Sequence, residues 1–178
     1  FNSHEARGGG ADIPHEAYLA ALIGDLEAAL PQVWGRRLSS IFIGGGTPSL
    51  MPAKMLDALL AAIRARLPLI PDAEITLEAN PGAIEAGQFE AFRDAGVNRI
   101  SLGIQSFNDT HLNALGRIHS ADEARRAIDT ALRHFDNVNL DMMYALPQQT
   151  LDEARRVAER ARQPGELLAF VGIGVLDP

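Results

Sequence analysis

Short apolar runs alternate with segments of helical periodicity along most of the chain. The runs are bounded by glycine, proline or polar residues and predict buried strands at residues 39–43, 74–79, 99–103, 138–143 and 167–175. Apolar residues spaced three and four apart predict helices at residues 14–30, 52–67, 83–95, 109–115, 122–134 and 150–162. Pro14, Gly96 and a Thr150–Glu153 capping box supply the start and stop signals expected of helix ends.

Strands that alternate with helices at these spacings predict right-handed βαβ units and a parallel sheet, hence an α/β fold. Neither an internal repeat nor a linker divides the 178 residues, so we expect a single domain. Periodicity does not distinguish a parallel (β/α) barrel from an open, doubly wound sheet, and both remain possible at this point.

Composition and charge argue against several classes of function. A net charge of −7, with the arginines scattered along helices, argues against nucleic-acid binding, which needs clustered Lys and Arg. No apolar run approaches the roughly 20 residues of a transmembrane helix, and no signal peptide is visible, so a cytoplasmic protein without a transmembrane segment is expected. The chain has no cysteine and therefore no disulfide framework and no thiolate metal site.

Polar or glycine-rich residues follow four consecutive predicted strands. They are Gly44-Gly45-Gly46-Thr47-Pro48, then Glu78-Ala79-Asn80-Pro81, then Gln105-Ser106, and finally Asp141 within the fourth strand. In parallel β/α folds the carboxyl ends of the strands carry the functional site, so these side chains are expected at one rim. Glycines there let a charged ligand approach backbone N–H groups, although this loop has neither a Walker nor a dinucleotide-binding spacing.

Each of these residues also has a plain structural interpretation. Glu78 and Arg117 fit solvated surface charges, Gln105 fits a brace for a loop, and the three glycines fit a tight turn. Asp141 is expected to be the least exposed and to need partners, because an unpaired buried charge is costly. The histidines show no metal-ligand spacing, and we assign neither a catalytic residue nor a metal ligand.

The motifs together resemble the radical S-adenosylmethionine (SAM) family. Residues 41–50 resemble its glycine motif, and residues 78–81, 99–107, 115–119 and 141–150 resemble one branch of it. That branch contains the oxygen-independent coproporphyrinogen III oxidases, which act in porphyrin biosynthesis, and the HemW-type heme chaperones. The resemblance covers roughly residues 1–160. The sequence Phe1-Asn2-Ser3-His4 resembles the heme chaperone type more than the oxidase type.

The resemblance implies a partial radical SAM barrel whose cofactors are SAM and a 4Fe-4S cluster. Residues 1–178 would then be an incomplete barrel domain without its first strand, with residues 1–13 left from the loop after the cluster motif and residues 163–178 a divergent tail. The cysteines that hold the cluster in the family are not in this chain, so by itself it is expected to be inactive. The SAM-binding positions implied are Gly45, Gly46, Thr47, Glu78, Gln105, Arg117 and Asp141.

Heme or a porphyrinogen, and a heme-receiving respiratory protein, are the partners that the resemblance implies. Three functions stay open: a heme chaperone of the radical SAM family, a coproporphyrinogen oxidase, and a heme carrier that acts without radical chemistry. A generic β/α-barrel enzyme whose motifs match by chance is the remaining alternative. It predicts that Glu78→Ala has no effect on SAM binding.

Overall fold

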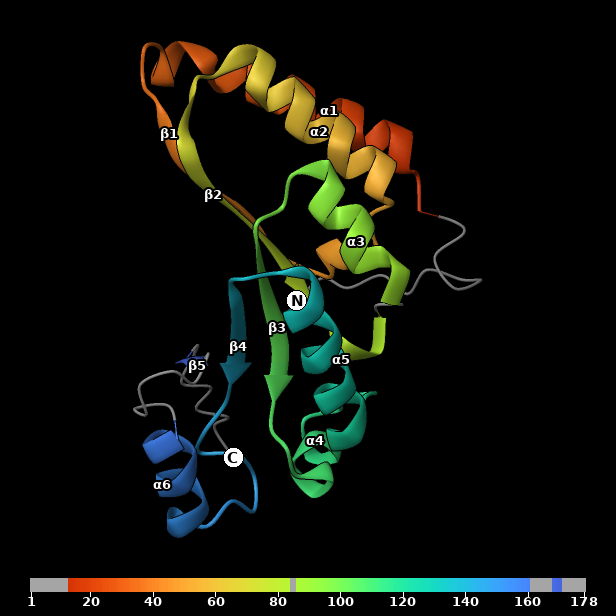
Figure 1. The fold of residues 1–178 in the computed structure, drawn as a ribbon, viewed down its shortest axis with the longest axis vertical. Helices are drawn as coiled ribbons and strands as arrows, with labels where there is room; N and C mark the ends of the chain where they lie inside the picture. The colour runs from red at the N-terminus through yellow and green to blue at the C-terminus, as the bar shows by residue number, and fades with distance from the viewer. Residues whose placement is uncertain (1–12, 84–85, 161–167, 171–178) are drawn as a thin grey trace.

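The computed structural model describes residues 13–83, 86–160 and 168–170 (Figure 1). Its strands are β1 (Leu38–Ile43), β2 (Leu69–Ala79), β3 (Arg99–Gln105), β4 (Val138–Met142) and β5 (Leu168–Phe170). Its α-helices are α1 (His15–Val33), α2 (Ala53–Arg66), α3 (Ala86–Ala95), α4 (Asp109–Ala114), α5 (Ala121–His134) and α6 (Leu151–Arg160). Two short 3-10 helices, η1 (Pro48–Leu50) and η2 (Pro81–Ala83), follow β1 and β2.

Each predicted strand and helix is present, with shifted bounds. The largest shift is in β2, which begins at Leu69 instead of residue 74. Its first residues include Pro71, yet β3 pairs with β2 only from Thr76 onward, so the early part has an open side where a missing N–H is tolerated. Outside the described part of the chain lie residues 1–12 of the predicted loop at 1–13, residues 84–85 and 161–162 of the helices predicted at 83–95 and 150–162, residues 167 and 171–175 of the last predicted strand, and residues 163–166 and 176–178 of the tail at 163–178.

The strand order distinguishes between the two sheet types that the sequence left open. The five strands lie in the order β1-β2-β3-β4-β5, and every neighbouring pair is parallel. A doubly wound sheet reverses its strand order at a switch point, whereas a (β/α) barrel adds each strand beside the last. The fold is therefore a partial parallel (β/α) barrel, as the family resemblance implied.

The two faces of the sheet differ in chemistry. One face of β2, β3 and β4 is apolar and packs with α2, α3 and α5 into the core; it carries Ile75, Leu77, Ile100, Leu102, Ile104, Val138 and Leu140. Figure 1 shows α2, α3 and α5 following one another along one side of the strands. Since successive side chains of a strand point to opposite faces, the residues between these form the other face, and it is polar.

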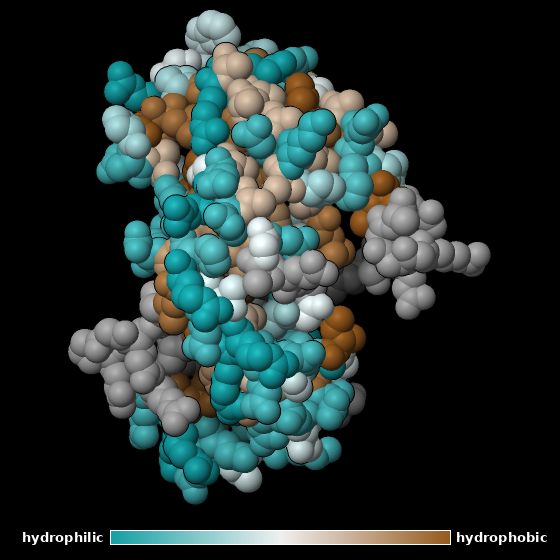
Figure 2. Space-filling model, turned by 45° about the vertical axis from the view of Figure 1, so that its right-hand side comes forward, coloured by the Kyte–Doolittle hydropathy of each residue, from teal (hydrophilic) through white to brown (hydrophobic). Residues whose placement is uncertain are grey.

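The helical side of the molecule is mostly hydrophilic where α5 lies, and hydrophobic residues reach the surface farther up, over α1 and α2 (Figure 2). Helix α1 has no buried residue and contacts mainly α2. None of the helices described here combines the length and the apolar character that crossing a membrane requires.

Candidate functional site

The carboxyl ends of β1 to β4 meet at one edge of the sheet because all pairings are parallel. In register, Glu78 of β2 lies opposite Ser101 of β3, and Ser101 lies opposite Asn139 of β4. Paired residues project to the same face of a sheet, and Asp141 follows Asn139 by two positions, so it projects there too. The predicted site residues Glu78 and Asp141 are thus on the same polar face, on strands β2 and β4, which flank β3.

The loop after β1 is open backbone. Gly45 and Gly46 have φ values of +88° and +66°, a left-handed conformation that glycine adopts without strain. A Cβ placed on either residue would have no heavy atom of another residue within 4 Å, so a ligand has room to approach the backbone. Thr47 follows, half-buried, and its carbonyl accepts a hydrogen bond from the Leu50 N–H at 3.0 Å, which begins η1.

Glu78 joins the second strand to this loop. The Gly45 N–H donates to Glu78 Oε2 at 2.9 Å, across 33 residues of sequence. Gly44 leaves the space for this contact, because a Cβ on Gly44 would lie 2.9 Å from the Glu78 carboxyl carbon and 2.6 Å from a ring carbon of Phe42. The three glycines therefore have separate tasks: Gly44 makes room for the carboxylate, and Gly45 and Gly46 shape the loop that meets it.

Gln105 ends β3 in a strained turn. Its φ is +64°, and the Ser106 N–H donates to the Ile104 carbonyl at 2.7 Å, which closes a three-residue turn centred on Gln105. The pairing of β3 with β4 shifts register between Leu102 and Gln105, and the Gln105 carbonyl accepts from the Met143 N–H at 2.9 Å. A left-handed non-glycine residue costs of order 1 kcal/mol or more, and such strain concentrates at functional sites.

The Gln105 amide also reaches the polar face. Its Nε2 lies 3.1 Å from the position that a Cβ on Gly103 would take, and Gly103 is on the same side of β3 as Ser101. Ala145 and Gln148, in the loop after β4, have φ values of +58° and +65°. The three left-handed non-glycine residues of the described part therefore all lie at or just past the carboxyl ends of β3 and β4.

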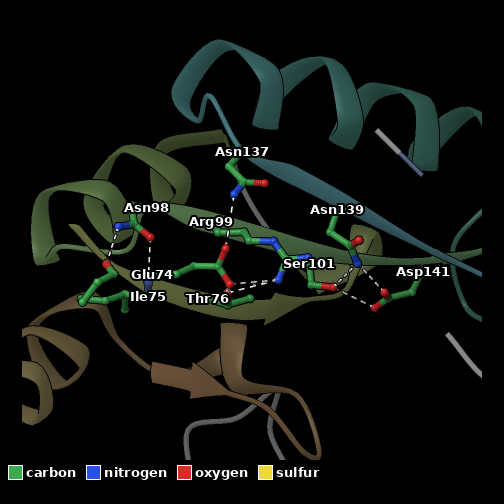
Figure 3. A network of polar contacts seen from close by, with 10 residues as sticks. Glu74, Ile75, Thr76, Asn98, Arg99, Ser101, Asn137, Asn139 and Asp141 are labelled. Carbon is green, nitrogen blue, oxygen red and sulfur yellow. Dashed lines mark hydrogen bonds and ion pairs between the residues drawn. The ribbon is translucent and has the colours of Figure 1, made fainter. Parts of the chain in front are cut away.

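Asp141 is held by two side chains. Ser101 Oγ donates to Asp141 Oδ2 at 3.0 Å, and Asn139 Nδ2 donates to Asp141 Oδ1 at 2.6 Å (Figure 3). Burial raises the pKa of Asp141, and the nearby Glu78 carboxylate raises it further, while the bonds from Ser101 and Asn139 and the charge of Arg99 lower it. The sequence predicted that Asp141 would be the least exposed of these residues, and this prediction was wrong: Asp141 is half-buried, whereas Gln105 is 8% exposed.

The polar face continues below the rim. Arg99 Nη1 lies 3.4 Å from Glu74 Oε1 and 3.3 Å from Thr76 Oγ1, and Asn137 Nδ2 lies 3.5 Å from Glu74 Oε2 (Figure 3). These are long, partly exposed contacts, so the Arg99–Glu74 pair contributes little to stability. Among the described residues of this face, the carboxylates of Glu74, Glu78 and Asp141 outnumber the one cation, Arg99. This excess of negative charge suits a ligand that carries positive charge.

The structure brings some predicted site residues together and leaves others apart. Gly45 and Glu78 are in contact, and Glu78, Gln105 and Asp141 share one face. Arg117 lies in the loop between α4 and α5, half-buried, and its backbone N–H donates to the Leu112 carbonyl at 2.9 Å. No hydrogen bond or ion pair among the described residues joins the Arg117 or Thr47 side chain to this group, so their place in the site stays a prediction.

Ser101 and Asn139 belong to this group but were not among the residues predicted from the sequence. Both lie inside strands that look apolar, and both are buried, at 3% and 6% exposed. A signal was available for Asn139, which precedes Asp141 by two residues and so shares its face. The same alternation relates Ser101 to Gln105, four residues later, but the pairing of Ser101 with Asp141 depends on the register of β3 against β4, which the sequence does not show.

These residues fit one of the two predicted cofactors. SAM carries an ammonium group, a sulfonium and ribose hydroxyls; half-buried carboxylates beside an open glycine loop are suitable partners for them. A 4Fe-4S cluster has no fit here: the chain contains no cysteine, and the described residues include no group of three His, Cys, Asp or Glu placed to hold a metal.

The chain matches a known protein family and several characterised proteins. A family model described as the radical SAM superfamily matches residues 20–161. The heme chaperone HemW of Escherichia coli strain K12 is 50% identical over 158 residues, covering 86% of this chain and 40% of that protein. The heme chaperone HemW of Haemophilus influenzae is 48% identical over 159 residues, covering 86% of this chain and 41% of that protein. These matches confirm the resemblance predicted from the motifs.

Solved structures agree with the fold. The coproporphyrinogen III oxidase HemN from Escherichia coli, a radical SAM enzyme, superposes with a TM-score of 0.72 at 30% identity, over 86% of this chain and 36% of that chain. The chain spans about two fifths of the length of the two HemW relatives. The partial barrel described here is thus of the radical SAM type.

Proposed function

The chain belongs to the radical SAM superfamily, and on that premise we propose that it forms the SAM-binding side of the barrel in a heme chaperone of the HemW type. The observation that carries the proposal is the contact between Gly45 N–H and Glu78 Oε2, which joins the glycine loop to the polar face of the sheet at the rim. The identity of about 50% to two heme chaperones, against 30% to the oxidase structure, supports the chaperone over the oxidase.

In this proposal each residue has a stated task. The backbone of Gly45 and Gly46, with Thr47, meets the methionine part of SAM, and the Glu78 carboxylate binds a polar group of the same molecule. Gln105, Arg117 and Asp141 make the further contacts. SAM together with a reduced cluster supplies radical chemistry in this family. The residues of this chain bind and orient the cofactor, and the low exposure of Gln105, Ser101 and Asn139 keeps water from the polar face beneath it.

The names of the relatives suggest a cargo, a partner and a location for this protein. We propose heme as the bound cargo, a heme-receiving respiratory protein as the partner, and the cytoplasm as the location. Nucleic acid is not proposed as a partner, because the net charge is −7. Coproporphyrinogen oxidation is the second candidate, favoured by the TM-score of 0.72 to an oxidase.

The test uses the full-length protein as it is made in the cell, titrated with SAM by calorimetry and with heme by absorbance spectroscopy. We expect both ligands to bind, and Glu78→Gln to weaken SAM binding about ten-fold, because a lost hydrogen bond to a charged group is worth roughly 1.5–3 kcal/mol. Glu90→Gln, an exposed carboxylate on α3, is the matched control and should bind SAM as the unaltered protein does.

The outcomes separate the candidates. Heme binding without conversion of coproporphyrinogen supports the chaperone, whereas conversion of coproporphyrinogen supports the oxidase. Binding of heme with no detectable binding of SAM would leave a heme carrier without radical chemistry. Equal SAM affinity in Glu78→Gln and Glu90→Gln would contradict the proposed site.

A further inference from the structure

We propose that Ser101 and Asn139 are positioning residues, which hold the Asp141 side chain as an oriented carboxylate for its ligand. The inference rests on the proposed function only in naming SAM as that ligand. Neither residue is expected to touch the cofactor, and both would act through Asp141. The three side chains make a closed set of hydrogen bonds across β3 and β4.

Three hydrogen bonds form a ring. Asn139 Nδ2 donates to Ser101 Oγ at 2.8 Å and to Asp141 Oδ1 at 2.6 Å, and Ser101 Oγ donates to Asp141 Oδ2 at 3.0 Å (Figure 3). Ser101 and Asn139 are paired in register, so the ring bridges the two strands. Each carboxylate oxygen thereby receives one hydrogen bond from within the ring.

The hydrogens of this ring favour the ionised state of Asp141. Asn139 donates both of its amide hydrogens within the ring, and Ser101 donates its hydroxyl hydrogen. Two of these three bonds therefore require the Asp141 carboxyl oxygens to act as acceptors. An ionised carboxylate accepts on both oxygens, whereas a protonated one carries a hydrogen on one oxygen and must give up or weaken a bond there. Ser101 and Asn139 are 3% and 6% exposed, so water has little access to replace a lost bond.

The ring acts against the other groups around Asp141. Burial and the Glu78 carboxylate of β2 favour the protonated form, while Arg99 of β3 and the two hydrogen bonds favour the ionised form. Without the ring, a half-buried aspartate near Glu78 would bind a proton more tightly.

The same ring sets the direction of Asp141. A carboxylate oxygen has two lone pairs, and each oxygen uses one of them within the ring. One acceptor position remains on each oxygen for a ligand that donates hydrogen bonds, such as a hydroxyl or ammonium group. Two donors fixed on adjacent strands hold the carboxylate plane more firmly than a single freely rotating partner would.

The experiment measures the Asp141 carboxyl directly, in the full-length protein. Carboxyl carbon NMR follows its titration without ligand, and calorimetry follows the dissociation constant for SAM across the same pH range. The variants are Ser101→Ala and Asn139→Leu, with Ser101→Thr as the conservative rescue. Thr130→Ala is the control, because Thr130 lies on α5, outside the rim, and its hydroxyl donates to the Arg126 carbonyl at 2.8 Å instead.

We expect the titration midpoint of Asp141 to move to higher pH in Ser101→Ala and Asn139→Leu, and to return in Ser101→Thr. SAM binding at neutral pH should weaken about ten-fold in both variants, because each loses a hydrogen bond to a charged group. The pH at which binding fails should rise together with the NMR midpoint. Thr130→Ala should change neither quantity.

The outcomes distinguish this inference from the proposed function. An unchanged midpoint in folded Ser101→Ala and Asn139→Leu, checked by circular dichroism, would overturn the positioning role. A midpoint that moves in a protein that binds no SAM at any pH would support the ring and contradict the proposed ligand. A midpoint that moves without any change in SAM affinity would overturn the positioning of Asp141 for that ligand.

Discussion

Gly44 is the residue whose missing side chain decides where Glu78 can lie. A Cβ at this position would come within 2.9 Å of the Glu78 carboxyl carbon and 2.6 Å of the Phe42 ring. Both neighbours are the ends of flexible side chains, so an added methyl group would displace them without breaking the backbone. At the residue scale, the rim therefore depends on a small residue as much as on its charged ones.

We predict that Gly44→Ala weakens SAM binding about ten-fold, because Glu78 must leave the Gly45 N–H. The fold should persist, so the thermal midpoint should change far less than the affinity. Calorimetry and a thermal melt measure the two effects in the same protein sample.

Gly87→Ala is the control for this prediction. Gly87 lies in α3, and a Cβ there meets nothing within 4 Å. We expect unchanged SAM affinity and a gain of about 0.5–1 kcal/mol in the free energy of unfolding, because alanine is the better helix residue. Unchanged affinity in Gly44→Ala as well would mean that the Gly45–Glu78 contact does not serve binding.

At the scale of elements, α5 and α6 begin with the same local device. Ser120 and Glu123 form a capping box at α5, and Thr150 and Glu153 form one at α6, where the Thr150 N–H donates to Glu153 Oε2 at 2.8 Å. Hydrogen bonds from the backbone and hydroxyl of Ser120 lower the pKa of Glu123, and those of Thr150 lower the pKa of Glu153. These bonds require only residues three positions apart, so they form wherever the helix forms.

We predict that Ser120→Ala lowers the free energy of unfolding by about 1 kcal/mol at neutral pH, the usual cost of losing an N-cap hydroxyl. A carboxylate whose pKa is lowered in the folded state stabilises the fold at pH values above the ordinary glutamate pKa of 4.5. This stabilisation is lost as the pH falls through the lowered pKa. The difference in free energy of unfolding between Ser120→Ala and the unaltered protein should therefore shrink below pH 4.5. Urea unfolding at a series of pH values measures it.

Ser120→Thr keeps the hydroxyl and should behave as the unaltered protein does. Asp141 contributes the opposite pH dependence of stability, because its raised pKa makes its burial less costly in acid. This contribution is the same in both proteins and cancels when they are compared at the same pH. A constant difference between Ser120→Ala and the unaltered protein at all pH values would contradict the role of the ionised Glu123.

At the scale of the whole molecule, one side of the sheet holds the fold together and the other carries the site. Leu77, Ile100 and Leu102 are 0% exposed on the side that the helices cover. Thr76, Ser101 and Asn139 point to the opposite side and bond mainly to one another and to charged neighbours. Replacing residues on the two sides should therefore affect different measurements.

We predict that Leu102→Ala lowers the free energy of unfolding by about 2–5 kcal/mol, because it leaves a cavity between β3 and the helices. Leu132→Ala, which shortens a leucine that is 46% exposed on α5, should change it by less than about 0.5 kcal/mol. Urea unfolding compares the two, and a similar small change in both would mean that the apolar side is loosely packed.

The sequence by itself determined the order and type of the elements, the capping boxes, and the rim at which polar residues collect. These features depend on periodicity and on neighbours a few positions apart, and the family resemblance added the barrel and the ligand. Tertiary structure decided the strand order, the left-handed turn at Gln105, and the ring of Ser101, Asn139 and Asp141. Such features depend on the register between strands about 40 residues apart, because register decides which side chains of two apolar-looking strands meet, and no local pattern encodes that pairing.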